Sequence, residues 1–221
     1  MEDVLDVYER PIDPKKPVVC LDERPCFLIG DKREVVLAKP GQLARFDYEY
    51  VRNGNATVFG LFAPLLGWRE MIVTERRTRV DFALCLKRLV DEFFLNAEKI
   101  VLVLDNLNTH TKASLYEAFT PEEAHRIAAR FEFHYTPKHG SWLSAPSPLG
   151  AAVGARNAVE IEFAALSKQC LDRRISDLGM LDREVRAWTI ERNVRAVKVN
   201  WLFRTVDARV KLASLYPSNV S

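Results

Sequence analysis

The feature that most constrains this chain is the segment VLVLDNLNTH at residues 101–110. Four apolar residues in a row, bounded by polar ones, indicate a strand that is buried on both faces of a sheet. The run ends in a carboxylate, Asp105. Strand ends are where α/β folds place their chemistry, so Asp105 is a candidate ligand or catalytic group. Asp and Asn are also the commonest turn formers after a strand, and this segment alone does not decide between the two roles.

A second apolar run near the start of the chain shows the same pattern. Residues 18–21, VVCL, are followed directly by Asp22. Two buried strands that each end in Asp predict a mixed sheet in which these strands lie side by side, with Asp22 close to Asp105. Further strands are expected at 34–38 as an edge strand, at 56–63 and 68–74 as a hairpin, and at 131–135.

Apolar residues at helical spacing predict four helices around this sheet. The first covers residues 80–95. The second begins with Thr120 as its N-cap, and Glu123 is placed to close a capping box. Two more helices run through residues 159–170 and 178–188. The expected fold class is therefore α/β, a mixed sheet flanked by helices.

Composition supports one globular domain over residues 1–221. Hydrophobic residues make up 48% of the chain, which is enough for a sizeable core. The net charge of +2 permits contact with nucleic acid but falls short of the strongly basic surface of a dedicated binder. The cysteines form no CxxC pair, and neither a signal peptide nor a segment of membrane-spanning length is present. We therefore expect a reduced, cytoplasmic protein with no membrane contact.

Asp22 and Asp105 would form a metal site if the sheet brings them together. Two neighbouring carboxylates repel each other, so both stay ionised at neutral pH only when a cation lies between them. Mg²⁺ suits such a site, because it binds a few carboxylates and keeps water or substrate phosphate as its other ligands. A third acid on a later helix would complete a site for two ions, which activates an oxygen nucleophile for attack on phosphorus. Periodicity leaves this acid open, since Glu160 and Glu162 flank the apolar stripe of their helix on opposite sides.

Three histidines, His110, His134 and His139, invite a zinc hypothesis. Their spacings match no common ligand motif, and histidines in strands or loops are more often structural hydrogen-bonding groups. Asn106, Asn108 and His110 are instead expected to shape the surroundings of the metal site or to touch DNA.

Several segments together resemble one protein family, the bacterial insertion-sequence transposases of the mariner-like superfamily. The resemblance covers nearly the whole chain and is carried by VVCLDE (18–23), RFDYEYVRNG (45–54), VTERRTRVDFA (73–83), KIVLVLDNLNTH (99–110), FEFHYTPKHGSWL (131–143), NAVEIEFAALSKQCLDRRI (157–175) and the tail 201–217. It implies the catalytic domain of a DDE transposase, a ribonuclease-H-like fold, and Asp22, Asp105 and Glu160 as the catalytic triad that binds two Mg²⁺ or Mn²⁺ ions. In this family an Asn precedes the catalytic Glu by three residues, as in NAVE at 157–160, so Glu162 is expected to be a solvated or DNA-facing acid.

The resemblance also implies binding partners. These are DNA, as element ends and target, and either a second copy of the chain or a full-length transposase. In the loop after the strand at 131–135, Lys138 is expected to pair with phosphate and Trp142 to stack on the DNA end. Simple packing of the loop is the alternative role for both side chains.

Two departures from the family bear on activity. Full-length relatives begin with helix-turn-helix modules, whereas this chain starts almost at the first catalytic strand, so we expect those modules to be absent. Residues 144–156, SAPSPLGAAVGAR, separate two segments that are contiguous in the family, and we expect an irregular insertion there. The expected function is metal-dependent DNA strand cleavage and transfer, weakened or lost through these departures. The alternatives are a non-catalytic remnant that binds DNA or a full-length transposase and interferes with transposition, and an unrelated doubly wound domain in which Asp105 only turns the chain.

Overall fold

The computed structural model describes residues 2–33, 39–41, 48–137, 145–146, 152–153, 157–199 and 203–211. Within these residues, five strands form one sheet in the order β3-β2-β1-β4-β5. The strands are β1 (Val18–Asp31), β2 (Tyr50–Ala63), β3 (Trp68–Thr74), β4 (Ile100–Leu104) and β5 (Phe131–Tyr135). β1 pairs with β2, and β2 with β3, in the antiparallel sense, whereas β1–β4 and β4–β5 are parallel. The predicted mixed sheet is confirmed, including the pairing of the first apolar run with the run that ends at Asp105.

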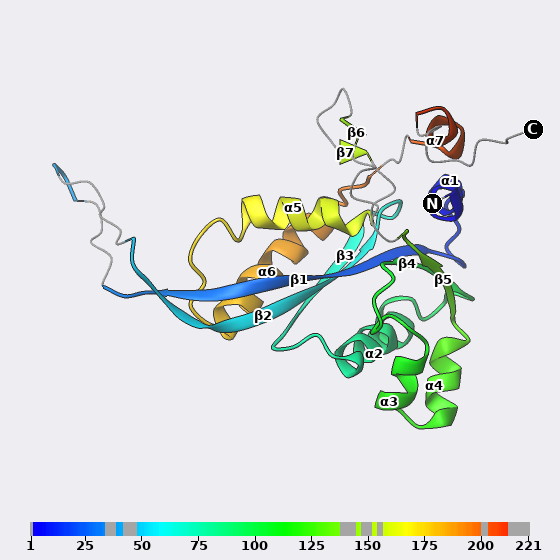
Figure 1. The fold of residues 1–221 in the computed structure, drawn as a ribbon, viewed down its shortest axis with the longest axis horizontal. Coiled ribbons are helices and arrows are strands. Elements are labelled where there is room, and N and C mark those ends of the chain that lie inside the picture. The colour runs from blue at the N-terminus through cyan, green and yellow to red at the C-terminus, as the bar shows by residue number, and fades with distance from the viewer. Residues whose placement is uncertain are drawn as a thin grey trace, which may run out of the picture.

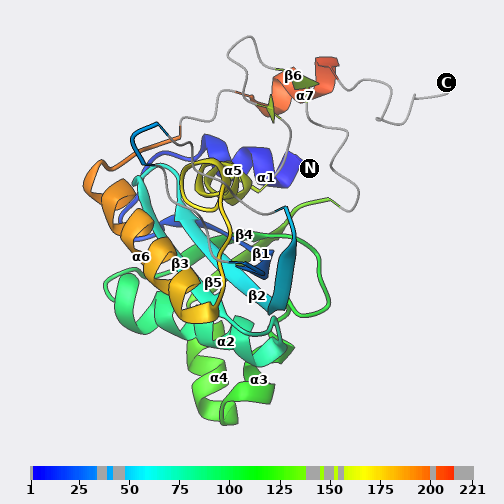
Figure 2. The same ribbon diagram turned by 90° about the vertical axis from the view of Figure 1, so that its left-hand side faces the viewer.

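Helices cover both faces of the sheet, and each face has its own core (Figures 1 and 2). One core packs under α1 (Glu2–Glu9), α5 (Val159–Gln169) and α6 (Leu178–Val194). The other packs under α2 (Arg79–Arg88), the π-helical turn η1 (Leu89–Phe93), α3 (Ala113–Ala118) and α4 (Pro121–Ala128). A last helix, α7 (Thr205–Lys211), lies against α1.

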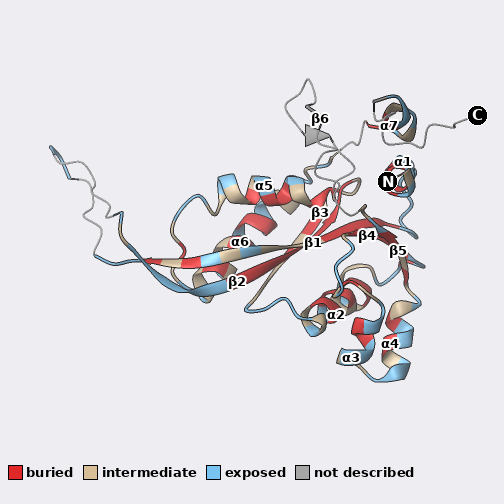
Figure 3. Cartoon of the chain, in the orientation of Figure 1, coloured by how far each residue is buried: buried red, intermediate tan, exposed pale blue. Residues whose placement is uncertain are grey.

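The position of β4 between two cores explains why its sequence is continuously apolar. Ile100, Leu102 and Leu104 belong to the core under α2–α4, whereas Val101 and Val103 belong to the core under α1, α5 and α6. Successive side chains of a strand point to opposite faces, so a strand covered on both faces needs apolar residues at every position. Figure 3 shows this burial running through the middle of the sheet.

The first strand is longer than expected, and the prediction that it ends at Asp22 is wrong. β1 continues through Pro25 to Asp31 and pairs with β2 from Cys20 opposite Phe62 to Asp31 opposite Tyr50. The two strands leave the body of the protein as a two-stranded ribbon (Figure 1). No helix covers the outer end of β2, where residues 50–55 are exposed, so it carries no apolar pattern for sequence reasoning to detect.

Other differences also have local causes. Helix α1 was not expected, although Val4, Leu5, Val7 and Tyr8 are all buried and lie at helical spacing. The helix predicted over 80–95 is α-helical only as far as Arg88, and η1 continues it.

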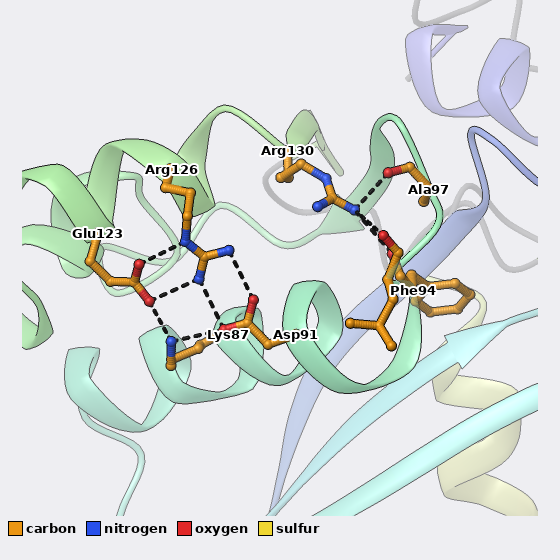
Figure 4. A network of polar contacts seen from close by, with 8 residues as sticks. Lys87, Asp91, Phe94, Ala97, Glu123, Arg126 and Arg130 are labelled. Atoms are coloured by element: carbon orange, nitrogen blue, oxygen red, sulfur yellow. Dashed lines mark hydrogen bonds and ion pairs between the residues drawn. The ribbon is translucent and has the colours of Figure 1, made fainter.

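A network of surface ion pairs joins α2 and η1 to α4 (Figure 4). Arg126 binds Asp91 through two nitrogens, at 2.9 Å each, and its Nε lies 2.7 Å from Glu123 Oε2. Lys87 Nζ lies 2.8 Å from Asp91 Oδ2 and also contacts Glu123. Thr120 is the N-cap of α4 as expected, but the Glu123 side chain joins this network instead of closing a capping box. Hydrogen bonds from Arg126 and Lys87 hold the pKa of Glu123 well below its usual range, at about 2.

Several expectations fall on residues outside the described ranges. The edge strand at 34–38 and the candidate DNA contacts Lys138 and Trp142 are among them. Within the expected insertion at 144–156, the structure describes two short strands that pair in the antiparallel sense, β6 (Ala145–Pro146) and β7 (Ala152–Val153). In the described part of the chain, no helix is both long and apolar enough to cross a membrane.

Candidate metal centre

The two predicted aspartates come together where β1 and β4 part. The parallel pairing of these strands covers only Val18–Cys20 and Val101–Val103. Continuing the register of Cys20 opposite Val103 by two residues sets Asp22 opposite Asp105, the first residue after β4. They are close enough for the charge of Asp105 to raise the pKa of Asp22. Residues so placed face each other because parallel strands keep a fixed register.

Asp22 lies in an environment that opposes its ionisation. Burial raises the pKa of its carboxyl group to about 7, and the charges of Asp105, Glu23 and Glu160 act in the same direction. A hydrogen bond of 2.8 Å from the backbone N–H of Glu23 to Asp22 Oδ1 opposes this shift without cancelling it. The charges of three acids therefore act on the Asp22 carboxylate, and two of these acids are the other predicted triad members.

Glu160 lies in the first turn of α5, near enough for its charge to raise the pKa of Asp22. Two contacts hold the start of the helix against the strands. The buried side-chain amide of Asn157 donates a hydrogen bond to the carbonyl oxygen of Leu21, the residue before Asp22. The hydroxyl oxygen of Tyr8 accepts a hydrogen bond of 3.1 Å from the backbone N–H of Ala158. The Asn that the resemblance pairs with Glu160 thus ties α5 directly to β1.

A glycine in β2 lets α5 approach the sheet closely. Gly60 lies opposite Asp22 in the β1–β2 register. A Cβ atom at Gly60 would come within 2.7 Å of Val159 Cγ2 and 2.8 Å of Phe163 Cζ, which is closer than non-bonded carbon atoms approach. The first turn of α5, which carries Glu160, therefore packs where a side chain at position 60 would lie.

We expect Gly60→Ala to displace α5 and to weaken metal binding. Overpacking a filled core costs about 1–3 kcal/mol in the free energy of unfolding. Adding Phe163→Leu should recover part of the loss, because it removes the ring atoms that the new methyl group meets. Urea unfolding and Mn²⁺ titration of the single and double variants measure the two effects. Wild-type stability and affinity for Gly60→Ala alone would contradict the argument.

The expectation that Glu162 is solvated or faces DNA is wrong. Its side chain is fully buried, with Oε2 at 2.9 Å from Arg69 Nε and 2.8 Å from Arg192 Nε. Arg69 comes from β3 and Arg192 from α6, so the Glu162 carboxylate links the sheet, α5 and α6. Because Glu162 lies on the side of α5 opposite the site, periodicity alone could not show that α6 covers it.

Sequence reasoning missed Glu23, which the structure places beside Asp105. Its side chain is 2% exposed, and its Oε1 lies 2.8 Å from His110 Nε2. His110 is fully buried, and its Nδ1 lies 2.5 Å from Asp105 Oδ1. Burial alone would lower the pKa of His110, but hydrogen bonds to Asp105 and Glu23 and their charges raise it to about 9. The only signal was the acidic doublet at 22–23, in which alternation points the second acid to the opposite face.

The candidate DNA-contacting residues differ in position. Of the two roles expected for His110, its burial favours support of the metal site over contact with DNA. Asn108 is exposed in the turn after β4, where a ligand could reach it. For both residues, as for the triad, the functional role stays a prediction.

The strand order, with helices on both faces, defines a ribonuclease-H-like domain. The sequence model described as DDE superfamily endonuclease matches residues 17–150, more than half of the chain, and the chain belongs to this family. The match includes Asp22 and Asp105 but ends before Glu160. The predicted resemblance to the catalytic domain of a DDE transposase is thereby confirmed, while a bacterial insertion-sequence origin stays a prediction.

Solved structures of the Mos1 transposase share this fold. The Mos1 mariner paired-end complex with Mn matches with a TM-score of 0.51 and 17% sequence identity, over 88% of this chain and 55% of the Mos1 chain. The Mos1 strand transfer complex matches with a TM-score of 0.51 and 16% identity, over 88% and 54% of the two chains. The chain thus spans about half the length of these relatives. A comparison with curated proteins gives no match.

Proposed function

We propose that this chain is the catalytic domain of a transposase that cleaves and transfers DNA strands with two Mg²⁺ or Mn²⁺ ions bound by Asp22, Asp105 and Glu160. One observation supports the proposal: in a chain of the DDE endonuclease family, the register of β1 and β4 sets Asp22 opposite Asp105, and the charges of Asp105 and Glu160 both raise the pKa of Asp22. Strand ends and the helix that covers them supply this kind of carboxylate site in α/β folds.

The donor set fits the ions. All three side chains offer carboxylate oxygens, the ligands that Mg²⁺ and Mn²⁺ prefer. Burial, followed by repulsion from neighbouring carboxylates, raises the pKa of Asp22, and a divalent cation would offset both effects. When bound, such ions activate an oxygen nucleophile and stabilise the charge that develops on the phosphate.

The protein's own part in the reaction is to hold these groups still. Asp22 is held within β1 by its pairing with β2, and Asp105 is held by its contacts with His110 and Leu107. The hydrogen bond of Asn157 and the space at Gly60 set the position of the turn that carries Glu160. Catalytic sites tolerate errors of only about 0.5 Å, so this support sets how well the triad can work. Asn108, exposed next to Asp105, would contact the DNA that enters the site.

The partners follow from the same proposal. DNA ends and target DNA are the substrates, and Lys138 and Trp142 are proposed to contact the DNA end. A second copy of the chain, or a full-length transposase, is the proposed protein partner, and the cytoplasm is the proposed location. The paired-end and strand transfer complexes of Mos1 support DNA as the ligand of this fold.

Nicking of supercoiled plasmid by the purified chain tests the proposal. We expect nicking that requires Mg²⁺ or Mn²⁺ and that is lost in Asp105→Asn and in Glu160→Gln. Glu122→Gln is a matched control, because Glu122 is exposed on α4 across the sheet from α5. Metal binding without nicking would favour the non-catalytic remnant that interferes with transposition. Absence of both metal binding and nicking would exclude a metal-dependent function.

A further inference from the structure

Polar contacts link three side chains in a row, Glu23, His110 and Asp105. Glu23 Oε1 contacts His110 Nε2 at 2.8 Å, and His110 Nδ1 contacts Asp105 Oδ1 at 2.5 Å. Glu23 and His110 are almost completely enclosed, whereas Asp105 is 36% exposed. This row of contacts therefore leads from the interior of the protein to the edge of the candidate metal centre.

The His110 ring has little freedom to move. It lies 4.7 Å from the Phe82 ring, centroid to centroid. Its backbone is also held, because its N–H donates to the Leu107 carbonyl at 3.1 Å and its carbonyl accepts from the Tyr135 hydroxyl at 2.9 Å. A hydrogen-bond donor fixed in this way determines the direction of whatever it binds.

His110 Nδ1 contacts two oxygens of Asp105, the side-chain Oδ1 at 2.5 Å and the backbone carbonyl oxygen at 3.3 Å. Oδ1 faces His110 Nδ1 and also accepts a long hydrogen bond of 3.4 Å from the backbone N–H of Leu107. Among the described residues, the other oxygen, Oδ2, has no hydrogen-bond partner. Hydrogen bonds that fix one oxygen of a carboxylate leave the second available to a cation in a defined orientation.

We propose that Glu23 and His110 are positioning residues, which orient Asp105 so that its Oδ2 is presented to the metal ion. The inference rests on the proposed function, because it assumes that Asp105 is a ligand. Glu23 holds the imidazole ring, and the ring holds the carboxylate. Burying two ionisable groups is costly unless they are paired, and here the pairing ends on the candidate ligand.

The rival role for His110 is direct ligation. One ligand atom each from Glu23, Asp105 and His110 lie within 4.8 Å of one another, so these residues could also enclose an ion themselves. Electron spin-echo modulation of Mn²⁺ bound to the wild-type protein separates the two roles without any variant. We expect no nitrogen coupling of a directly bound imidazole. Such a coupling would overturn the positioning role.

Two substitutions of His110 separate its contact with Asp105 from its contact with Glu23. In His110→Asn the amide nitrogen replaces Nδ1, which keeps the bond to Asp105 and loses the bond to Glu23. In His110→Gln the amide nitrogen replaces Nε2, which keeps Glu23 and loses Asp105. We expect His110→Gln to bind Mn²⁺ about 10–100-fold more weakly than wild type, and His110→Asn to bind it nearly as well.

The two His110 variants should rank in the opposite order when their stability is compared. His110→Asn leaves the buried Glu23 unpaired, whereas His110→Gln leaves only the more exposed Asp105 unpaired, so the Asn variant should melt at the lower temperature. Mn²⁺ affinity by electron paramagnetic resonance and melting temperature by circular dichroism give the two rankings. A purely structural role would make both measurements fall in the same variant, and that result would overturn the inference.

His134→Gln is the matched control. His134 also lies between two carboxylates, with Nδ1 at 2.8 Å from Asp3 Oδ2 and Nε2 at 2.7 Å from Glu132 Oε1, but neither carboxylate belongs to the proposed triad. It should leave Mn²⁺ affinity unchanged. If wild type does not bind Mn²⁺, or Asp105→Asn binds it normally, the proposed function fails. If Asp105→Asn abolishes binding but His110→Gln does not weaken it, only the positioning role fails.

Discussion

Asp22→Asn is expected to make the metal-free protein more stable at pH 8 while abolishing metal binding. The pKa of Asp22 is about 7 in the folded protein, against 3.8 for an ordinary Asp carboxyl group. Above pH 7 the folded chain holds an ionised carboxylate among Asp105, Glu23 and Glu160, and Asn removes that charge at similar size. A pKa shift of this size corresponds to on the order of 2–4 kcal/mol in the free energy of unfolding. The partial exposure of the site makes the lower end of this range the expected value.

The direction of the pKa shift determines how the contribution of Asp22 to stability changes with pH. Because the folded-state pKa is raised, the contribution of Asp22 to stability is fully present below about pH 4 and is lost as the pH rises through 7. The advantage of Asp22→Asn should therefore grow between pH 4 and 7 and then level off. Urea unfolding in EDTA across this range measures it, with Asp182→Asn on the exposed face of α6 as the control. An Asn variant that is less stable than wild type at pH 8 would show that the carboxylates are not crowded.

Glu162→Gln should cost far more stability than Glu160→Gln, although the two residues lie in the same helix. Removing the charge of Glu162 leaves Arg69, fully buried, and Arg192, 15% exposed, without their shared carboxylate. Breaking a buried ion pair in this way costs about 3–5 kcal/mol. Glu160 is partly exposed and adds to the repulsion at Asp22, so its loss should change stability little and remove metal binding instead.

The two variants can be compared directly by thermal unfolding and Mn²⁺ titration. The expected result is a crossed pattern, in which one variant loses stability and the other loses affinity. Similar melting temperatures for both would mean that the arginines find other partners, and would contradict the argument for a buried cluster around Glu162.

The parts of the fold that sequence alone predicted are those where burial repeats along the chain. β4 alternates between two cores and is apolar throughout, so its position was read correctly, and the pairing that sets Asp105 opposite Asp22 followed from it. The outer half of β1 escaped prediction because a two-stranded ribbon buries neither face completely. A sequence pattern records how much of an element is covered, but it does not record which element covers it.

The candidate site divides in the same way. Asp22 and Asp105 could be predicted because each directly follows an apolar run. Glu162 could not, since its burial depends on Arg69 and Arg192, which are distant in sequence. The sequence around Glu23 does not reveal its burial either, because its partner His110 lies beyond three further strands, α2 and η1. Long-range polar pairing leaves no periodic trace along the chain.

The parallel pairing of β1 with β4 also has a consequence for the order of folding. It joins residues 18–20 to 101–103, with the β2–β3 hairpin and α2 lying between them in the chain, and α5 follows later still. Contacts of such long sequence separation are slow to form, because the loop must be closed before the contact stabilises it. We therefore expect the three acids to come together only late in folding. A cation bound by them should then slow unfolding and leave the folding rate nearly unchanged.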